Sequence, residues 1–131
     1  MKVLTIKEPW ATLIIEGYKK YEFRSWKTNY RGKLLIHASS TKIPKEWRDN
    51  KELMKLVEDK KLNYGKIVCS CELVDCIYMD KNFIKNIKEN NQEYLCGIYE
   101  EGRYAWILQN IEIVNSDKKV KGHLGIWNYD F

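Results

Sequence analysis

The order of patterns along this chain predicts an α+β fold, in which a mostly antiparallel, curled sheet or small β-barrel is flanked by two to three helices. Strand-like segments, marked by alternating or continuous apolar residues, outnumber helix-like segments. Their order is strand, helix, two strands, helix and then mainly strands, and no Pro-rich or Ser-rich linker divides them. We therefore expect a single domain, residues 1–131, with one continuous core.

The first half of the chain contains three predicted strands and two predicted helices. In order, these are a strand at residues 3–6, a helix from Glu8 to Gly17, strands at 21–26 and 33–39, and a helix at 45–57. Pro9 suits the first turn of a helix, and the acidic Glu8 suits the positive end of the helix dipole. Gly17 is placed to end the first helix in the left-handed conformation.

The second half is dominated by two long predicted strands. In order, its elements are a strand at residues 66–78, a polar helix or loop at 80–95, a short strand at 97–99, a hairpin turn at 100–102, a long strand at 103–114 and a final strand at 124–127. Residues 66–78 are rich in Val, Ile and Cys, which is typical of a buried strand. Because strands are the majority here, the sheet should be mainly antiparallel.

The charge of the chain favours an anionic partner such as nucleic acid, but only mildly. The formal net charge is +5, and lysine supplies most of the 23 basic residues. The small number of arginines argues against an extended phosphate-binding surface, and the lysine excess is also what an AT-rich genome produces. No apolar stretch is long enough for a membrane helix, and the N-terminus lacks the apolar region of a signal peptide. We expect a cytoplasmic, monomeric protein that does not bind membranes.

The four cysteines predict no metal site. Cys69, Cys71 and Cys76 lack the spacing of a zinc motif, and no histidine lies close to them in sequence. In a reducing compartment we expect all four, including Cys96, to act as small apolar side chains. No metal and no other cofactor is predicted.

The stretch from Gly17 to Arg24 is the strongest functional signal. Because alternate residues of a strand share a face, Glu22, Arg24 and Trp26 should project together, opposite a core-facing Phe23 and its neighbours Tyr21 and Ser25. Lys19, in the preceding turn, has a stem long enough to bring its ammonium over the same face. We expect these charges to converge, unburied, at the mouth of a pocket that binds a small ligand or nucleotide. A solvated salt bridge is the alternative.

Four further residues are candidates for the same cleft. His37 and Ser39 share a face of one strand, and Tyr104 and Trp106 share a face of another. A lone histidine among apolar residues is usually a core group, and the two aromatic residues are core by default. Side chains two residues apart on a strand stand about 6.5–7 Å apart, so we propose no catalytic dyad of His37 and Ser39.

An ordered series of motifs resembles the ASCH (activating signal cointegrator homology) domain, a branch of the PUA-like superfamily. The resemblance covers the chain apart from roughly residues 43–65 and 78–100. The matching features are Pro9-Trp10, Gly17-x-Lys19-x-x-Glu22-x-Arg24, Trp26, Arg31-Gly32, Ile36-His37-Ala38-Ser39, Glu72-Leu73-Val74-Asp75, Tyr104-Ala105-Trp106 and Lys121-Gly122-His123-Leu124-Gly125-Ile126-Trp127.

The resemblance implies a PUA-like β-barrel with a cleft into which the signature residues point, and a role in RNA or nucleotide binding. Some relatives hydrolyse acylated cytidines with a lysine, a threonine and a distant glutamate. Lys19 matches the lysine and Glu72 the distant glutamate, whereas Glu22 stands in place of the threonine. A carboxylate accepts a proton but is a poor substitute for a hydroxyl.

Three classes of function follow. The leading hypothesis is binding of RNA, another single-stranded nucleic acid or a modified nucleoside, in which Glu22 accepts from an exocyclic amine and the aromatic side chains stack the base. The alternative is hydrolysis of an N-acylated nucleoside, such as N4-acetylcytidine, or of an RNA phosphodiester bond, with Glu22 or Glu72 as general base. The third class is a protein-interaction module that uses exposed aromatic side chains.

Overall fold

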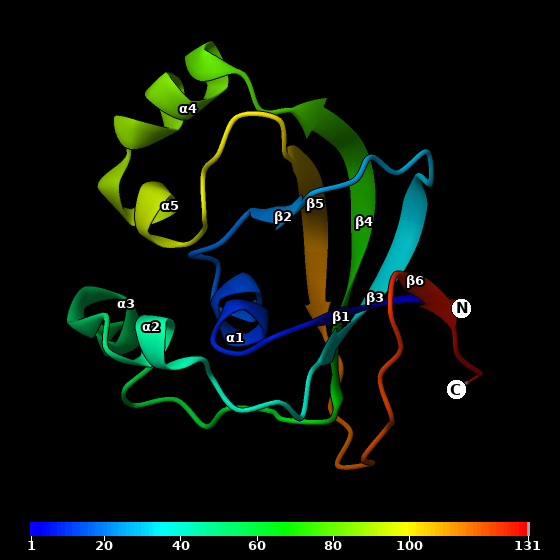
Figure 1. Cartoon of the computed structure of the whole chain (residues 1–131). Helices are drawn as coiled ribbons and strands as arrows, with labels where there is room; N and C mark the ends of the chain where they lie inside the picture. The colour runs from blue at the N-terminus through cyan, green and yellow to red at the C-terminus, as the bar shows by residue number, and fades with distance from the viewer. Residues whose placement is uncertain (131) are drawn as a thin grey trace.

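A six-stranded curled sheet, with helices on one side of it, forms the protein (Figure 1). The computed structural model describes residues 1–130. The strands are β1 (Lys2–Ile6), β2 (Tyr21–Arg24), β3 (Gly32–Ala38), β4 (Ile67–Tyr78), β5 (Tyr104–Ile113) and β6 (Ile126–Asn128). The helices are α1 (Trp10–Ile15), α2 (Lys45–Arg48), α3 (Lys51–Lys55), α4 (Lys81–Lys88) and α5 (Asn91–Leu95). The α+β class with a barrel-like sheet is confirmed.

The strands follow the order β2-β5-β4-β3-β1-β6, and the sheet forms a half-barrel. Four of the five pairings are antiparallel, as predicted, and β1 pairs with β3 in parallel. Two register shifts lie in the pairing of β4 with β5, between Ser70 and Glu72 and between Leu73 and Asp75. Such bulges bend a strand and increase its twist, which is how the long β4 follows the curl.

The main core lies between the sheet and α1. Helix α1 is buried over nearly its whole length, from Trp10 to Ile14, and packs with the apolar residues of β3, β4 and β5. Its start is held by Glu8, whose carboxylate accepts hydrogen bonds from the backbone N–H and hydroxyl of Thr12 and from the Asn63 N–H. Gly17 follows the helix with φ +83°, so the predicted left-handed stop is confirmed.

The number of helices differs from the prediction. The expected helix at 45–57 is divided into α2 and α3, and the segment 80–95 is divided into α4 and α5. In each case an asparagine interrupts the run and caps the next helix: the Asn50 side chain accepts from the Leu53 N–H, and that of Asn90 from the Glu93 N–H. The part of the chain that the structure describes therefore has five short helices, not two to three. No strand forms at 97–99 either, where the chain is a loop.

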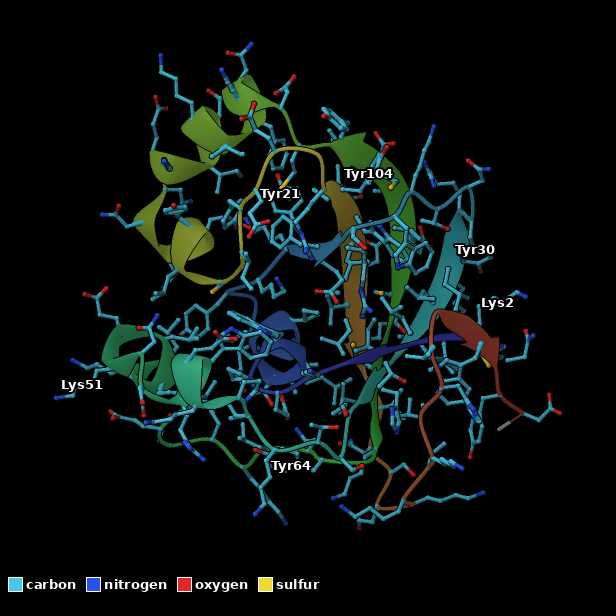
Figure 2. The ribbon with its side chains drawn as sticks, in the orientation of Figure 1. Lys2, Tyr21, Tyr30, Lys51, Tyr64 and Tyr104 are labelled. Carbon is cyan, nitrogen blue, oxygen red and sulfur yellow. The ribbon has the colours of Figure 1, made fainter. Side chains whose placement is uncertain are left out.

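The pair α4–α5 and the loop after it pack against the edge of the sheet at β2. Tyr21 points from β2 toward α4, where its ring meets Phe83 edge-on with centroids 5.7 Å apart (Figure 2). Phe23 meets the ring of Tyr99 in the loop at 4.6 Å. These ring contacts hold the segment between β4 and β5 beside β2, the strand that carries Glu22 and Arg24.

The four cysteines are unpaired and buried, as predicted. Among residues 1–130, no helix combines the length and apolar character needed to cross a membrane.

Candidate functional site

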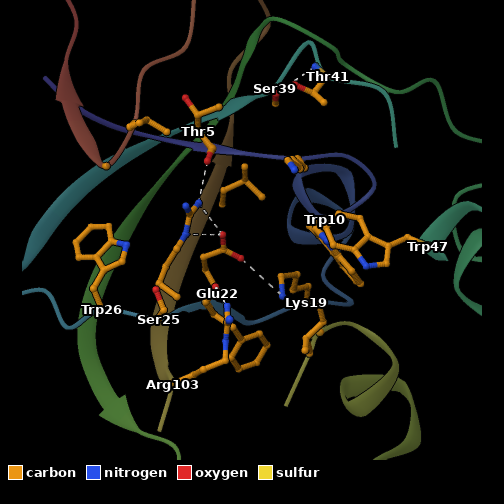
Figure 3. Close-up of a pocket in the computed structure, with 18 of the residues that line it drawn as sticks. Thr5, Trp10, Lys19, Glu22, Ser25, Trp26, Ser39, Thr41, Trp47 and Arg103 are labelled. Carbon is orange, nitrogen blue, oxygen red and sulfur yellow. Dashed lines mark hydrogen bonds and ion pairs between the residues drawn. The ribbon is translucent and has the colours of Figure 1, made fainter. Parts of the chain in front are cut away.

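A cleft of about 540 Å³ opens where the curled sheet is not closed (Figure 3). This volume lies in the range of roughly 300–1,000 Å³ that is typical of small-molecule sites. Its walls come from β1, the edge strand β2, the start of α1, the loop before β5 and the segment before β6. The lining residues are Thr5, Ile6, Lys7, Trp10, Lys19, Glu22, Phe23, Arg24, Ser25, Trp26, Ser39, Thr41, Trp47, Gly97, Ile98, Arg103, His123, Leu124 and Gly125.

Three residues of the sequence signature form a row in this cleft, with the carboxylate in the middle. Glu22 Oε2 lies 2.9 Å from Arg24 Nη2 and accepts from Arg24 Nε at 3.1 Å. Glu22 Oε1 lies 3.9 Å from Lys19 Nζ. The expected convergence on one face is therefore present, but the expected exposure is wrong: Lys19 is 4% exposed and Glu22 7% exposed. Mutual pairing reduces the cost of burying these charges.

Lys19 is enclosed by aromatic rings. Its ammonium lies 4.4 Å from the ring centroid of Phe23 and 5.1 Å from that of Trp10, and it donates to the Cys96 carbonyl at 2.7 Å. Burial lowers the pKa of Lys19 to about 8, while the neighbouring Glu22 acts in the opposite direction. Desolvation therefore outweighs the effect of Glu22 on the Lys19 pKa. The side chain is mainly protonated at pH 7 and mainly neutral well above pH 8.

Arg24 connects the two sides of the opening. Its Nη2 donates to the Thr5 carbonyl of β1 at 2.8 Å, although β1 and β2 are not paired in the sheet. One edge of the guanidinium is therefore used for structure. Its Nη1 makes no hydrogen bond within residues 1–130 and is available to a ligand.

Arg103 is a cleft residue that the sequence analysis missed. Its Nη2 donates to the Phe23 carbonyl at 3.3 Å, while its Nε is buried without a hydrogen-bond partner. A buried N–H without a partner is costly to the folded protein. A single arginine at the start of a strand carries no local signal of such a role. Its place in the cleft depends on the pairing of β5 with β2, which sets the neighbouring Tyr104 opposite Arg24.

Trp26 forms an exposed aromatic wall of the cleft. Its ring is 39% exposed and stands edge-on against Trp106, with centroids 4.7 Å apart. Trp106 itself is fully buried in the core and donates from Nε1 to the Trp26 carbonyl at 3.4 Å. Trp106 therefore supports the wall from behind. Ser25, predicted on the opposite face, also lines the cleft because the strand ends at Arg24.

The structure places His37 outside the lining of the cleft. It is buried, its Nδ1 lies 3.1 Å from Thr5 Oγ1, and its Nε2 lies 2.6 Å from the Val120 carbonyl. Since the Val120 carbonyl can only accept, His37 donates to it from Nε2. In the neutral ring Nδ1 then accepts from the Thr5 hydroxyl, whose oxygen in turn accepts from Trp127 Nε1. Desolvation lowers the pKa of His37. In this position His37 anchors the segment that carries His123 and Leu124 to the rim.

The other candidates are divided between the cleft and the remainder of the molecule. Ser39 lines the cleft, and its Oγ accepts from the Thr41 N–H. Tyr104 packs on Tyr78 beside the core, with ring centroids 5.6 Å apart. Glu72 is exposed on β4, opposite Lys33 of β3, and does not line the cleft. Within residues 1–130, no group of three or more His, Cys, Asp or Glu side chains is arranged to hold a metal ion.

Comparison with known proteins agrees with the sequence motifs. A family model, that of the ASCH domain, matches residues 4–118. Two curated relatives are named Activating signal cointegrator 1: the human protein is 28% identical over 134 aligned residues, and the mouse protein 27%. The alignments cover 97% of this chain but only 22% of each relative, so the chain spans about a fifth of their length.

Proposed function

This chain belongs to the ASCH domain family, and on that premise we propose that its cleft binds RNA or a nucleotide. Four cationic side chains, those of Lys7, Lys19, Arg24 and Arg103, line the cleft against the single carboxylate of Glu22. This excess of positive charge is the observation that carries the proposal, because phosphate groups contribute most of the affinity in nucleic-acid binding.

The aromatic side chains support a nucleotide rather than a simple anion. Trp26 is exposed at one wall, and Trp10 and Trp47 lie at another with ring centroids 5.1 Å apart. Stacking of a base on an aromatic ring contributes roughly 1–3 kcal/mol. In this arrangement the phosphate of the ligand lies near the exposed Lys7. The base lies in the deeper part of the cleft, where Glu22 accepts a hydrogen bond from an N–H of the base.

The proposal is tested by fluorescence anisotropy with a short labelled single-stranded RNA. Arg24→Ala should weaken binding roughly 10- to 150-fold, the loss expected for a hydrogen bond to a charged group. Lys7→Ala is a second cleft variant. Because Lys7 is exposed, its replacement should not disturb folding. Lys51→Ala, an exposed lysine of α3 that does not line the cleft, is the matched control. Unchanged affinity in both cleft variants contradicts the proposal.

A second candidate function, hydrolysis, is favoured by one observation, the lowered pKa of Lys19, to about 8, beside Glu22. In the hydrolysis of an N-acylated nucleoside, water adds to the acyl carbon while Glu22 takes its proton. The C–N bond then breaks, and the Lys19 ammonium protonates the leaving amine. Because Glu72 does not line the cleft, this proposal depends on Glu22.

Incubation of the purified protein with N4-acetylcytidine, and separately with labelled RNA, distinguishes the two functions. A hydrolase yields cytidine and acetate, or shortened RNA, and Glu22→Gln abolishes the product. A binding protein yields no product from either substrate, and in that case the hydrolase proposal fails while the binding proposal stands.

A further inference from the structure

We propose that the cleft selects a base whose edge presents a ring N–H between two carbonyl oxygens, as uracil does. The inference rests on the proposed nucleotide-binding function and specifies which base the site reads. It follows from the order of donors and acceptors on the wall formed by Lys19, Glu22 and Arg24.

The row alternates donor, acceptor and donor. Figure 3 shows the Glu22 carboxylate joined to the Lys19 ammonium by a dashed line, and the Arg24 guanidinium pairs with the other oxygen of the same carboxylate. Lys19 lies 3.9 Å from one carboxylate oxygen and Arg24 2.9 Å from the other. The Arg24 guanidinium is always protonated and can only donate. The Lys19 ammonium is the main form of that side chain at neutral pH, and it too can only donate.

Each member of the row retains unused hydrogen-bonding capacity. Lys19 uses one of its three N–H groups, toward the Cys96 carbonyl. Glu22 Oε1 accepts no hydrogen bond within the part of the chain that the structure describes, since 3.9 Å is too long for one. Arg24 Nη1 also makes no hydrogen bond among the described residues, and the cleft is lined in addition by Arg103, whose Nε is buried without a partner. Hydrogen-bonding capacity left unused in a largely buried row favours a ligand that supplies the missing partners.

The complement of this row is an edge in the order acceptor, donor, acceptor. Uracil has it, with the N3–H between O2 and O4. Cytosine places its ring nitrogen acceptor in the middle, where it faces the carboxylate. Guanine has one acceptor beside two donors, and adenine an amine beside a ring acceptor. A base that sets an acceptor against the Glu22 carboxylate, or a donor against the Lys19 ammonium, is disfavoured because the two groups then repel each other and neither makes a hydrogen bond.

A phosphate fits the row less well than a base edge does. A phosphate between Lys19 and Arg24 would lie against the Glu22 carboxylate, and two anions in contact at a buried site repel each other. The exposed Lys7, at the rim, offers a phosphate a position away from Glu22.

The test is isothermal titration calorimetry of the full chain with uridine 5′-monophosphate, cytidine 5′-monophosphate and uridine 5′-monophosphate methylated at N3. Methylation at N3 removes the only hydrogen-bond donor on the edge of the uracil base, while the charge of the nucleotide and the stacking of its ring are kept. We expect the uridine nucleotide to bind most tightly and N3 methylation to weaken binding roughly 5- to 150-fold, the effect of leaving buried groups unpaired. Equal affinity for the three nucleotides overturns the inference.

A variant provides a second readout. In Glu22→Gln the acceptor becomes an amide that also donates, so the preference for uridine over cytidine should disappear while the thermal melt confirms folding. Glu16→Gln, an exposed carboxylate outside the cleft, is the matched control and should keep the preference. If Glu22→Gln folds and retains the full preference, the row does not read the base and the inference fails.

The same titrations separate this inference from the function on which it rests. A mixed-sequence RNA that binds through Arg24 and Lys7, with no preference for uridine, leaves the binding function intact and overturns the base assignment. No binding of any nucleotide or RNA overturns both. If a short oligouridylate binds more tightly than the mononucleotide, the ligand is uridine within RNA. If the two bind equally per site, the ligand is the free nucleotide. Both outcomes support recognition of the uracil edge.

Discussion

At the residue scale, Lys19 combines two roles. It holds the loop after α5 through the Cys96 carbonyl, and it lines the cleft beside Glu22. Its enclosure by Trp10 and Phe23 is the reason that its pKa falls to about 8. The same burial makes Lys19 a source of pH-dependent stability.

The stability contributed by Lys19 should rise with pH above its folded-state pKa. That pKa, about 8, lies below the ordinary value of 10.5, so between these values the unfolded chain binds more protons than the folded one. The free energy of unfolding therefore rises across this range by about 3 kcal/mol from this group, and is constant below pH 8. Urea unfolding of the natural chain and of Lys19→Met at pH 7 and pH 10 measures it. Parallel changes in the two proteins would show that Lys19 titrates normally.

Arg103 should be important for ligand binding and nearly neutral for stability. Its Nε is buried without a partner, which offsets the hydrogen bond from Nη2 to the Phe23 carbonyl. We expect Arg103→Met to change the free energy of unfolding by less than about 1 kcal/mol and to weaken RNA binding about tenfold or more. Unfolding curves and anisotropy on the same samples give both quantities. A large loss of stability with unchanged affinity would make Arg103 a structural residue only.

The signature residues could be predicted from the sequence because they are neighbours on one strand. Glu22 and Arg24 are two residues apart, so the alternation of a strand is sufficient to place them together. Arg103 and Lys7 could not be predicted, since their distance from Glu22 depends on how separate strands are arranged. The extent of burial of Lys19 was missed for the same reason: the loop that covers it is 77 residues further along the chain.

At the scale of elements, the loop after α5 is fitted closely to β2. A Cβ atom on Gly97 would lie 2.3 Å from Phe23 Cε2 and 2.7 Å from Cδ2, which is closer than any real contact. The loop therefore reaches this position only because residue 97 has no side chain. Gly97 and Ile98 of this loop form part of the cleft wall.

We expect Gly97→Ala to destabilise the protein by about 1–3 kcal/mol, the usual cost of overpacking, and to weaken RNA binding by displacing the loop. Phe23→Leu is the matched variant, because a smaller side chain leaves room for the added methyl group. In that background Gly97→Ala should cost less, so a double-mutant cycle should give a coupling energy of opposite sign to the single losses. Additive effects would show that the contact with Phe23 does not determine the loop position.

Element types were predicted better than element limits. The strands were found because their apolar patterns are long, as in β4 and β5. The two divided helices were missed because the sequence gives one amphipathic pattern across each pair, whereas the break depends on whether Asn50 and Asn90 cap a helix or continue it. An asparagine side chain competes with the backbone for hydrogen bonds, so either outcome was compatible with the pattern.

At the scale of the whole molecule, electrostatics distinguishes an RNA-binding protein from a protein-interaction module. The chain carries a formal net charge of +5, and four cations line the cleft. If Lys7 and Arg103, the two cations outside the row, neutralise phosphates, the logarithm of the RNA association constant should fall against the logarithm of salt concentration with a slope of roughly −1 to −2.

Anisotropy between low and moderate salt measures this slope, and Lys7→Ala should reduce its magnitude by roughly 0.7. Lys51→Ala, outside the cleft, should change it less. A slope near zero would favour an apolar partner surface formed by Trp26, Ile98 and the 98% exposed Leu124.

The half-barrel itself was predictable, but the way the C-terminal segment completes the cleft was not. His37 was singled out from its strand, yet its partners Val120 and Trp127 lie more than 80 residues away. Only the folded sheet, with β6 added beside β1, shows that this histidine secures the rim and does not line the cleft.

The pairing of β1 with β6 also brings the first and the last described residues close together, and the Met1 amino group donates to the Tyr129 carbonyl at 2.7 Å (Figure 1). A short peptide linker could therefore fuse the ends, and new ends could be cut at the exposed Glu101–Gly102 turn between β4 and β5. Such a circular permutant would keep all six strands in their present order. It could also be inserted as a unit into a surface loop of another protein.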